Sequence, residues 1–124
     1  MLEVRKFFYS ISLDSYNISH KDVLRRISYH LNNNLHREDG PAVEEYYPNG
    51  NKKMEIWGIN GEHFRKDGGP TYIQYYSDGT SEYEMWGYGD NIKHRIDAPA
   101  IIKYDNNGNI VKQWFYENGV EIIK

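Results

Sequence analysis

A spacing of 29 residues runs through most of the sequence. Four kinds of residue recur at this interval without a gap: a proline, a tyrosine, a glycine and a bulky aromatic residue. The sets are Pro41, Pro70 and Pro99; Tyr46, Tyr75 and Tyr104; Gly50, Gly79 and Gly108; and Trp57, Trp86 and Phe115. Self-similarity at a fixed period of this length is typical of repeat proteins. We therefore predict a repeat fold, in which these residues have structural roles.

Each copy carries two turn signals. The first is Asn49-Gly50, Asp78-Gly79 or Asn107-Gly108, flanked by aromatic and β-branched residues. These dipeptides accept positive φ at both central positions of a type I′ turn, so each predicts a hairpin. The second follows the returning strand, at Asn60-Gly61, Gly89-Asp90 and Asn118-Gly119. The sequence thus predicts an all-β meander of hairpins.

The N-terminal third is less regular. Residues 7–13 alternate apolar and polar side chains, which predicts a strand. Residues 23–31 fit both a helical stripe, with Ser19 as its cap, and strict alternation, so one short helix stays an alternative here. The repeat favours a strand, because Tyr29 then takes the position of Trp57 and Asn32-Asn33 that of Asn60-Gly61.

The chain is expected to form a single domain, residues 1–124. In this organisation residues 1–34 are a divergent N-terminal capping unit, and residues 35–62, 63–91 and 92–122 are hairpin repeats. An end unit of a repeat array has one neighbour only and must cap the stack, which agrees with its divergence. A chain of 124 residues has room for one modest core.

Charge and composition exclude several classes of partner. Residues 1–34 carry five Lys/Arg and three Asp/Glu, whereas residues 35–124 carry ten and fifteen, which gives −3 overall. A nucleic-acid footprint needs a clustered basic face, so no nucleic acid is expected, and the same charge disfavours an anionic membrane. There is no cysteine and no apolar run of membrane-spanning length. We expect a cytoplasmic protein.

The pattern "YYPNG…W…NG" resembles the MORN-repeat variant of bacterial antitoxin-type proteins. The preceding "LHREDGPA" resembles a longer version of that repeat, found in small proteins of phages, large DNA viruses and bacteria. The resemblance covers residues 35–122 well. It implies an elongated, curved antiparallel sheet that serves protein or membrane-surface contacts and performs no chemistry. For a phage-encoded chain it implies the host cytoplasm.

A His-Arg-Asp pattern precedes each proline. Its members are His36, Arg37 and Asp39; His63, Arg65 and Asp67; and His94, Arg95 and Asp97. Such a ladder could bind a metal or an anion. The favoured interpretation is structural: each Asp accepts backbone N–H bonds, while each Arg pairs with Asp or lies over an aromatic ring. A motif present in every unit serves the unit, so we expect no catalytic residue, metal or cofactor.

Specificity is expected where the copies differ. The candidate contacts for a protein partner are Arg25, Arg26, Tyr29, Phe64, Tyr72, Tyr83 and Tyr88. Exposed Tyr and Trp beside Arg are typical of binding hot spots. The predicted function is a non-enzymatic protein-binding module, a phage- or mobile-element-associated inhibitor that docks onto and neutralises a host defence or toxin protein. The alternatives are a sponge for nucleotide-like anions and a MORN-type membrane-surface or scaffold adaptor.

The oligomeric state is open at this point. The last strand, near residues 112–116, leaves an edge free for pairing with another chain unless the C-terminal "VEIIK" covers it. Self-association through that edge is a prediction.

Overall fold

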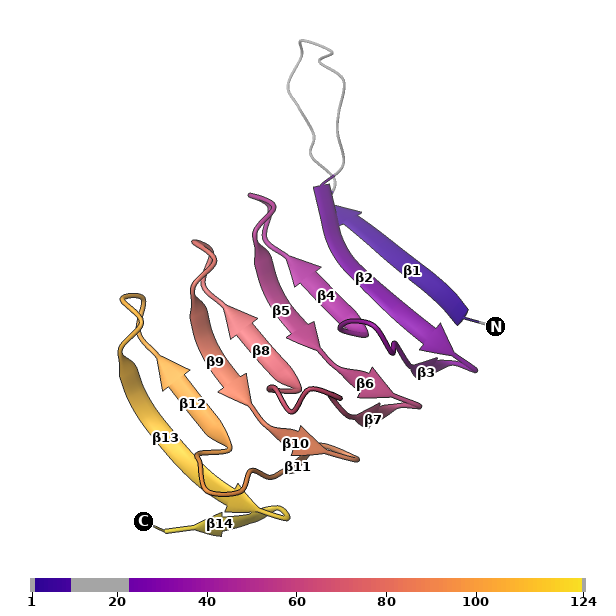
Figure 1. Ribbon diagram of the computed structural model, residues 1–124. Helices are drawn as coiled ribbons and strands as arrows, with labels where there is room; N and C mark the ends of the chain where they lie inside the picture. The colour runs from indigo at the N-terminus through magenta and orange to yellow at the C-terminus, as the bar shows by residue number, and fades with distance from the viewer. Residues whose placement is uncertain (1, 10–22, 124) are drawn as a thin grey trace, which may run out of the picture.

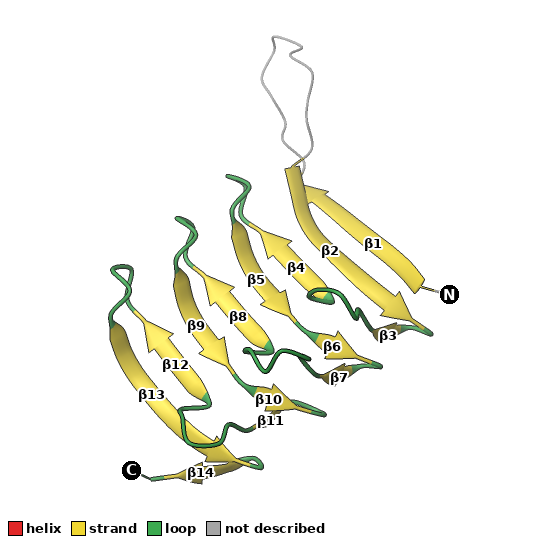
Figure 2. Cartoon of the chain, in the orientation of Figure 1, coloured by secondary structure: helices red, strands yellow, loops and turns green. Residues whose placement is uncertain are grey.

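The computed structural model describes residues 2–9 and 23–123, which form an open, all-β antiparallel fold without a helix in that part of the chain (Figures 1 and 2). The main sheet has the order β1-β2-β4-β5-β8-β9-β12-β13-β14, with β3 beside β2. Its long strands are β1 (Leu2–Tyr9), β2 (Val23–Leu31), β4 (Val43–Tyr46), β5 (Lys52–Ile56), β8 (Tyr72–Tyr75), β9 (Ser81–Met85), β12 (Ile101–Tyr104) and β13 (Ile110–Glu117). The predicted all-β class is confirmed.

A second series of short strands runs along one end of the long strands in Figure 1. It comprises β3 (Asn34–Leu35), β6 (Gly58–Ile59), β7 (Glu62–His63), β10 (Gly87–Tyr88), β11 (Ile92–Lys93) and β14 (Val120–Ile122). Backbone bonds join successive members: Gly61 N–H donates to Leu35 O, His63 and Gly89 exchange both bonds, and Gly119 N–H donates to Lys93 O. These short hairpins are therefore connected to one another as well as to the main sheet.

The turn chemistry differs from the prediction. At the first turn Gly50 has φ 90°, but Asn49 is not among the residues with positive φ. Gly50 N–H donates to Tyr47 O, and Tyr47 N–H donates to Asn51 O. This is a turn closed by a single left-handed glycine, of the type that ends in a G1 bulge. The predicted type I′ turns at Asn49-Gly50, Asp78-Gly79 and Asn107-Gly108 are therefore wrong.

Positive φ at two successive residues occurs at the second turns instead. Asn60-Gly61 has φ of 50° and 81°, and Asn118-Gly119 has 51° and 82°. In copy two the loop between β10 and β11 has one more residue, Gly89-Asp90-Asn91, and positive φ falls on Gly89 and Asn91. The short hairpins thus contain the tight turns.

The N-terminal unit follows the strand alternative. Val23–Leu31 is a strand, so the helical alternative is wrong for these residues; Ser19, Ile11 and Leu13 lie outside the described residues. Tyr29 N–H donates to Ala42 O as Trp57 N–H donates to Thr71 O, and Asn32 and Asn33 have φ of 52° and 67°. The predicted equivalence of Tyr29 with Trp57 thus has a counterpart in the backbone.

Tyrosine hydroxyls connect successive hairpins. Tyr9 Oη donates to Tyr46 O at 2.8 Å, Tyr47 Oη to Tyr75 O at 2.6 Å, and Tyr76 Oη to Tyr104 O at 2.7 Å. Asp105, which replaces the tyrosine in copy three, instead accepts bonds from N–H groups of its own turn, at Asn107 and Asn109. The last hairpin therefore has no hydroxyl of this kind to offer a further neighbour.

The register assigns every paired residue to one of two faces, because directly opposed residues share a face. One face, here called the glutamate face, carries Glu44, Glu55 and Glu84 in one row. The other, the methionine face, carries two rows. Its inner row is Ser28, Val43, Ile56, Tyr72, Met85, Ile101 and Trp114, and its outer row is Arg26, Glu45, Met54, Gln74, Tyr83, Lys103 and Lys112.

The core is small and divided between the two faces. Val43, Met85 and Ile101 are buried on the methionine face, and Ile73 and Ile102 on the glutamate face. Ala42 and Ala100, just outside the strands, are fully buried as well. A sheet with so few buried aliphatic residues depends strongly on contacts of its aromatic rings.

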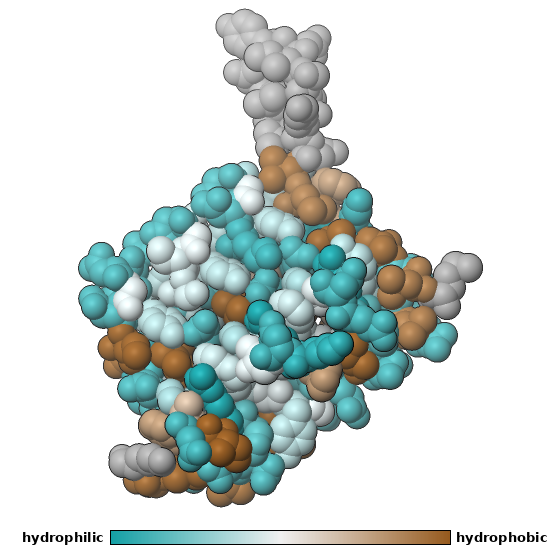
Figure 3. Space-filling model, in the orientation of Figure 1, coloured by the Kyte–Doolittle hydropathy of each residue, from teal (hydrophilic) through white to brown (hydrophobic). Residues whose placement is uncertain are grey.

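Most exposed apolar residues lie at the two ends of the sheet, with Phe64, Tyr88 and Ile96 exposed between them, and Figure 3 shows the face between the two ends as largely hydrophilic. Leu2, Val4, Phe7 and Phe8 are exposed on β1, and Ile110, Val111, Val120 and Ile123 near the C-terminus. β14 pairs with Phe115–Glu117 and so covers part of the predicted open edge, while the rest of β13 pairs with β12 alone. Self-association through an edge strand stays a prediction.

Candidate functional site

The arginine of each repeat lies over an aromatic ring of the preceding returning strand. The Cζ atom is 4.1 Å from the ring centroid for Arg37 over Tyr29, 4.0 Å for Arg65 over Trp57 and 3.8 Å for Arg95 over Trp86. The same guanidinium groups donate to the carbonyls of Pro41, Pro70 and Pro99 at 3.1 to 3.2 Å. A stacked, hydrogen-bonded guanidinium has few donors left for a ligand.

The aspartates of this pattern help to hold the arginines. Asp39 accepts from Arg37 at 3.1 Å, and Asp67 accepts from Arg65 and from Gly69 N–H. Asp97, the third aspartate of the pattern, has a backbone φ of 60°, in the left-handed region. Nowhere in residues 2–9 and 23–123 do three His, Asp or Glu side chains come together in a way that could hold a metal ion.

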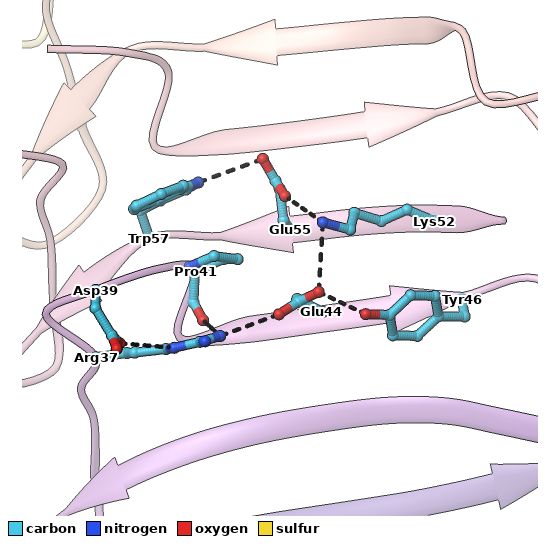
Figure 4. A network of polar contacts seen from close by, with 8 residues as sticks. All are labelled: Arg37, Asp39, Pro41, Glu44, Tyr46, Lys52, Glu55 and Trp57. Atoms are coloured by element: carbon cyan, nitrogen blue, oxygen red, sulfur yellow. Dashed lines mark hydrogen bonds and ion pairs between the residues drawn. The ribbon is translucent and has the colours of Figure 1, made fainter. Parts of the chain in front are cut away.

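The polar network around Glu44 and Glu55 is also internally paired (Figure 4). Glu44 contacts Arg37 at 3.1 Å and Lys52 at 3.3 Å, and it accepts from Tyr46 Oη. Glu55 contacts Lys52 at 3.0 Å and accepts from Trp57 Nε1 at 3.4 Å. Both carboxylates are therefore held by structural partners.

The repeated tyrosines complete this network. Tyr46 donates to Glu44, Tyr75 to Glu55 and Tyr104 to Glu84. Burial, reinforced by the carboxylate that accepts the phenol proton, raises the pKa of Tyr104 to about 12 and raises those of Tyr46 and Tyr75 further. All three phenols stay neutral in the folded protein at pH values where a free tyrosine ionises.

These pKa values predict an alkaline loss of stability. The folded pKa of Tyr104 lies above the ordinary value of 10.0, so its contribution is complete below about pH 10 and is lost as the pH rises toward 12. Urea titrations between pH 8 and 11 should show the free energy of unfolding falling above about pH 10. Tyr104→Phe should flatten this fall. Ile110→Ala, which changes an exposed residue without an ionisable group, should leave it unchanged; an equal effect of both variants would contradict the prediction.

The histidines do not form the predicted ladder. His36 Nδ1 accepts from Asn60 N–H at 3.1 Å, and His94 Nδ1 accepts from Asn118 N–H at 2.9 Å. In copy two the equivalent position is held by Phe64, whose N–H donates to Trp57 O as those of His36 and His94 donate to Tyr29 O and Trp86 O. The extra residue in the "FRKDGG" segment shifts the pattern, and His63 therefore lies in a different environment.

His63 forms one wall of a groove of about 460 Å³. The floor of the groove belongs to the methionine face: Ile56, Tyr72, Gln74, Tyr83 and Met85. The wall above this floor comes from the short hairpins. It consists of His63 of β7, Lys93 of β11, and Asn91 in the loop between β10 and β11. The groove therefore lies where the short hairpins approach the main sheet at copy two.

Aromatic and polar groups alternate along this groove. The rings of Tyr72 and Tyr83 meet edge to face, with centroids 5.9 Å apart, and Tyr72 Oη donates to Gln74 at 3.1 Å. Burial lowers the pKa of His63, with Asp90 opposing the shift, so the imidazole is neutral at pH 7. Its Nδ1 is buried and has no hydrogen-bond partner within the described residues. An apolar floor with such orienting groups can hold a side chain of a partner.

A second hollow of about 330 Å³ adjoins the groove, because His63 lines both. It includes Phe64, which is 50% exposed, Tyr88, which is 38% exposed, and Ile59. The structure thus brings the four candidate residues of copy two, Phe64, Tyr72, Tyr83 and Tyr88, into one region on either side of His63.

The three N-terminal candidates lie elsewhere and already have partners. Arg25 lies 5.7 Å from the centroid of Phe7, Arg26 forms an ion pair with Glu45 at 2.7 Å, and Tyr29 lies beneath Arg37. They line none of the hollows described above. Conversely, sequence reasoning missed His63, Gln74, Asn91 and Lys93 as members of the groove.

Comparison with protein-family models, with curated proteins and with solved structures gave no match for this chain. A separate observation concerns membranes: the described part of the chain contains no helix that could cross one.

Proposed function

We propose that this chain is a non-enzymatic protein-binding module that receives its partner on the methionine face. The observation that carries the proposal is the groove, where Tyr72 and Tyr83 form a half-buried aromatic floor against His63 and Lys93. Tyrosine rings give a large contact area at small entropic cost and are frequent in hot spots of protein interfaces. The glutamate face, by contrast, uses its polar groups internally.

The resemblance to small phage, viral and bacterial repeat proteins extends this proposal. We propose that the partner is a host defence or toxin protein, which the module neutralises by occupying part of its surface.

A pull-down with the folded chain tests the proposal. The immobilised protein is expected to retain one protein in stoichiometric amount from the cell that naturally contains it. Tyr72→Ala, which removes part of the groove floor, should abolish this retention, whereas Ile110→Ala, which changes an exposed residue of the glutamate face, should keep it. Recovery of no stoichiometric protein, or equal recovery by the wild type and Tyr72→Ala, would count against a protein-binding groove. Calorimetry with a nucleotide panel tests the anion-sponge alternative, for which heat of binding is required.

A further inference from the structure

The outer row of the methionine face changes its charge from one end to the other. Arg26 and Glu45 are directly opposed and form an ion pair at 2.7 Å, so this end is neutral. Two strands further along, the row continues with Gln74 and Tyr83 and ends with Lys103 opposite Lys112. At the 29-residue spacing, Lys103 and Lys112 of copy three occupy the positions of Glu45 and Met54 in copy one.

The two lysines at the end of this row lack a neutralising partner. Both are exposed, and neither forms an ion pair within residues 2–9 and 23–123. Directly opposed residues of an antiparallel pair have Cβ atoms about 5 Å apart, where like charges destabilise the sheet. The row therefore contains a local repulsion that an anionic ligand would relieve.

Aromatic rings and a third lysine surround this pair. Lys112 Nζ lies 4.8 Å from the centroid of Trp114, and Lys93 Nζ lies 5.9 Å from that of Tyr116. Because Lys93 also lines the groove, this contact places Tyr116 near the groove. The three lysines thus extend from the apolar groove across β12 and β13, and we call Lys93, Lys103 and Lys112 the lysine cluster.

The extent of the lysine cluster favours a peptide over a nucleic acid. A nucleic-acid strand carries a phosphate at every nucleotide and would run from the lysines onto Glu45 and onto Glu82, which Gln74 contacts at 3.1 Å. The chain also has a net charge of −3. A peptide can place carboxylates only where the lysines are and an apolar side chain where the groove is. The hydrophobic floor of the adjacent groove would make no favourable contact with a phosphate backbone.

We infer that the methionine face binds an acidic segment of a protein partner, with carboxylates on the lysine cluster and an apolar side chain in the groove whose floor includes Tyr72 and Tyr83. This inference rests on the proposed function, because it specifies the partner chemistry for the same groove. The carboxylates relieve the Lys103–Lys112 repulsion, and the apolar residue covers the rings that the short hairpins leave open.

A fluorescein-labelled ten-residue peptide, with glutamates around one central leucine, tests the inference by anisotropy. The folded chain should bind it at about 20 mM salt and lose affinity steeply toward about 300 mM, as screened charges require. Lys103→Glu with Lys112→Glu should weaken binding at least about tenfold. Lys66→Glu, which makes one such change on an exposed loop lysine away from the cluster, serves as the matched control and should have little effect.

A second readout separates binding from folding. Lys103→Glu alone converts the opposed like charges into opposite charges. It should therefore raise the melting temperature of the protein while it lowers the affinity for the peptide. A drop in melting temperature would contradict the repulsion on which the inference depends.

Several outcomes overturn the inference. They are absence of peptide binding at low salt, equal loss in Lys66→Glu and the cluster variant, tighter binding of a peptide with glutamine in place of glutamate, and tighter binding of a ten-residue oligothymidylate. If the protein retained in the pull-down depends on Tyr72 but not on the lysines, the acidic segment is wrong and the proposed function stands. If neither Tyr72 nor the lysines matter, both fail.

Discussion

Trp57→Ala is expected to lower the free energy of unfolding by about 3 kcal/mol, near the lower end for the truncation of a tryptophan because the ring is half-buried. The indole supports Arg65 at 4.0 Å and donates to Glu55 at 3.4 Å. Its loss removes the ring on which Arg65 stacks, and thereby weakens the hold of Arg65 on the segment that leads to Pro70. Urea unfolding followed by circular dichroism measures the change.

Trp57→Phe is the matched control, because it keeps a ring beneath Arg65 and loses only the indole N–H and some area. It should cost clearly less than Trp57→Ala. A loss below about 1 kcal/mol for Trp57→Ala would show that the arginine–aromatic column is not a main support of the sheet, since changes of that size are usual at ordinary positions.

Tyr83→Ala is expected to weaken binding of the protein partner by about 2 kcal/mol or more, which is roughly a thirtyfold rise in Kd. The ring lies in the outer row, faces the groove and meets Tyr72 edge to face at 5.9 Å. Truncation therefore removes both its own contact area and the support of Tyr72. Calorimetric titration of the captured partner with the wild type and the variant measures the difference.

Ile110→Ala is the control for this second prediction. Ile110 is 52% exposed and lies on the glutamate face, opposite Tyr104. It should change the partner affinity by less than a factor of about two, because a single exposed apolar residue outside an interface contributes little. If both variants weaken binding equally while their urea midpoints match, the partner does not use the groove.

Much of the fold could be predicted because the 29-residue spacing aligns turns and strands in every copy. The type of each turn could not. Asn49-Gly50 and Asn60-Gly61 look equivalent in the sequence, yet positive φ occurs at Gly50 alone in the first and at both residues in the second. The difference depends on the number of residues between the paired strands, which local dipeptide preference does not contain.

The candidate site was predicted in part. The idea that specificity lies where the copies differ identifies Tyr72 and Tyr83, and the structure places both in the groove. It missed the histidine, because the sequence aligns His63 with His36 and His94, whereas the backbone aligns Phe64 with them. It also missed Lys103 and Lys112, although these occupy the positions of Glu45 and Met54 at the 29-residue spacing. Only the cross-strand register brings them into one row.

Site-specific photo-crosslinking tests the central claim most directly. A photoreactive phenylalanine analogue is introduced in place of Tyr83 in one preparation and in place of Ile110 in another, and each is irradiated in the presence of the partner. A groove-bound partner predicts a single discrete crosslinked species from position 83, mapped to an acidic segment of the partner, and none from position 110. Equal crosslinking from both positions, or crosslinking from position 110 alone, would contradict the assignment of the methionine face as the binding surface.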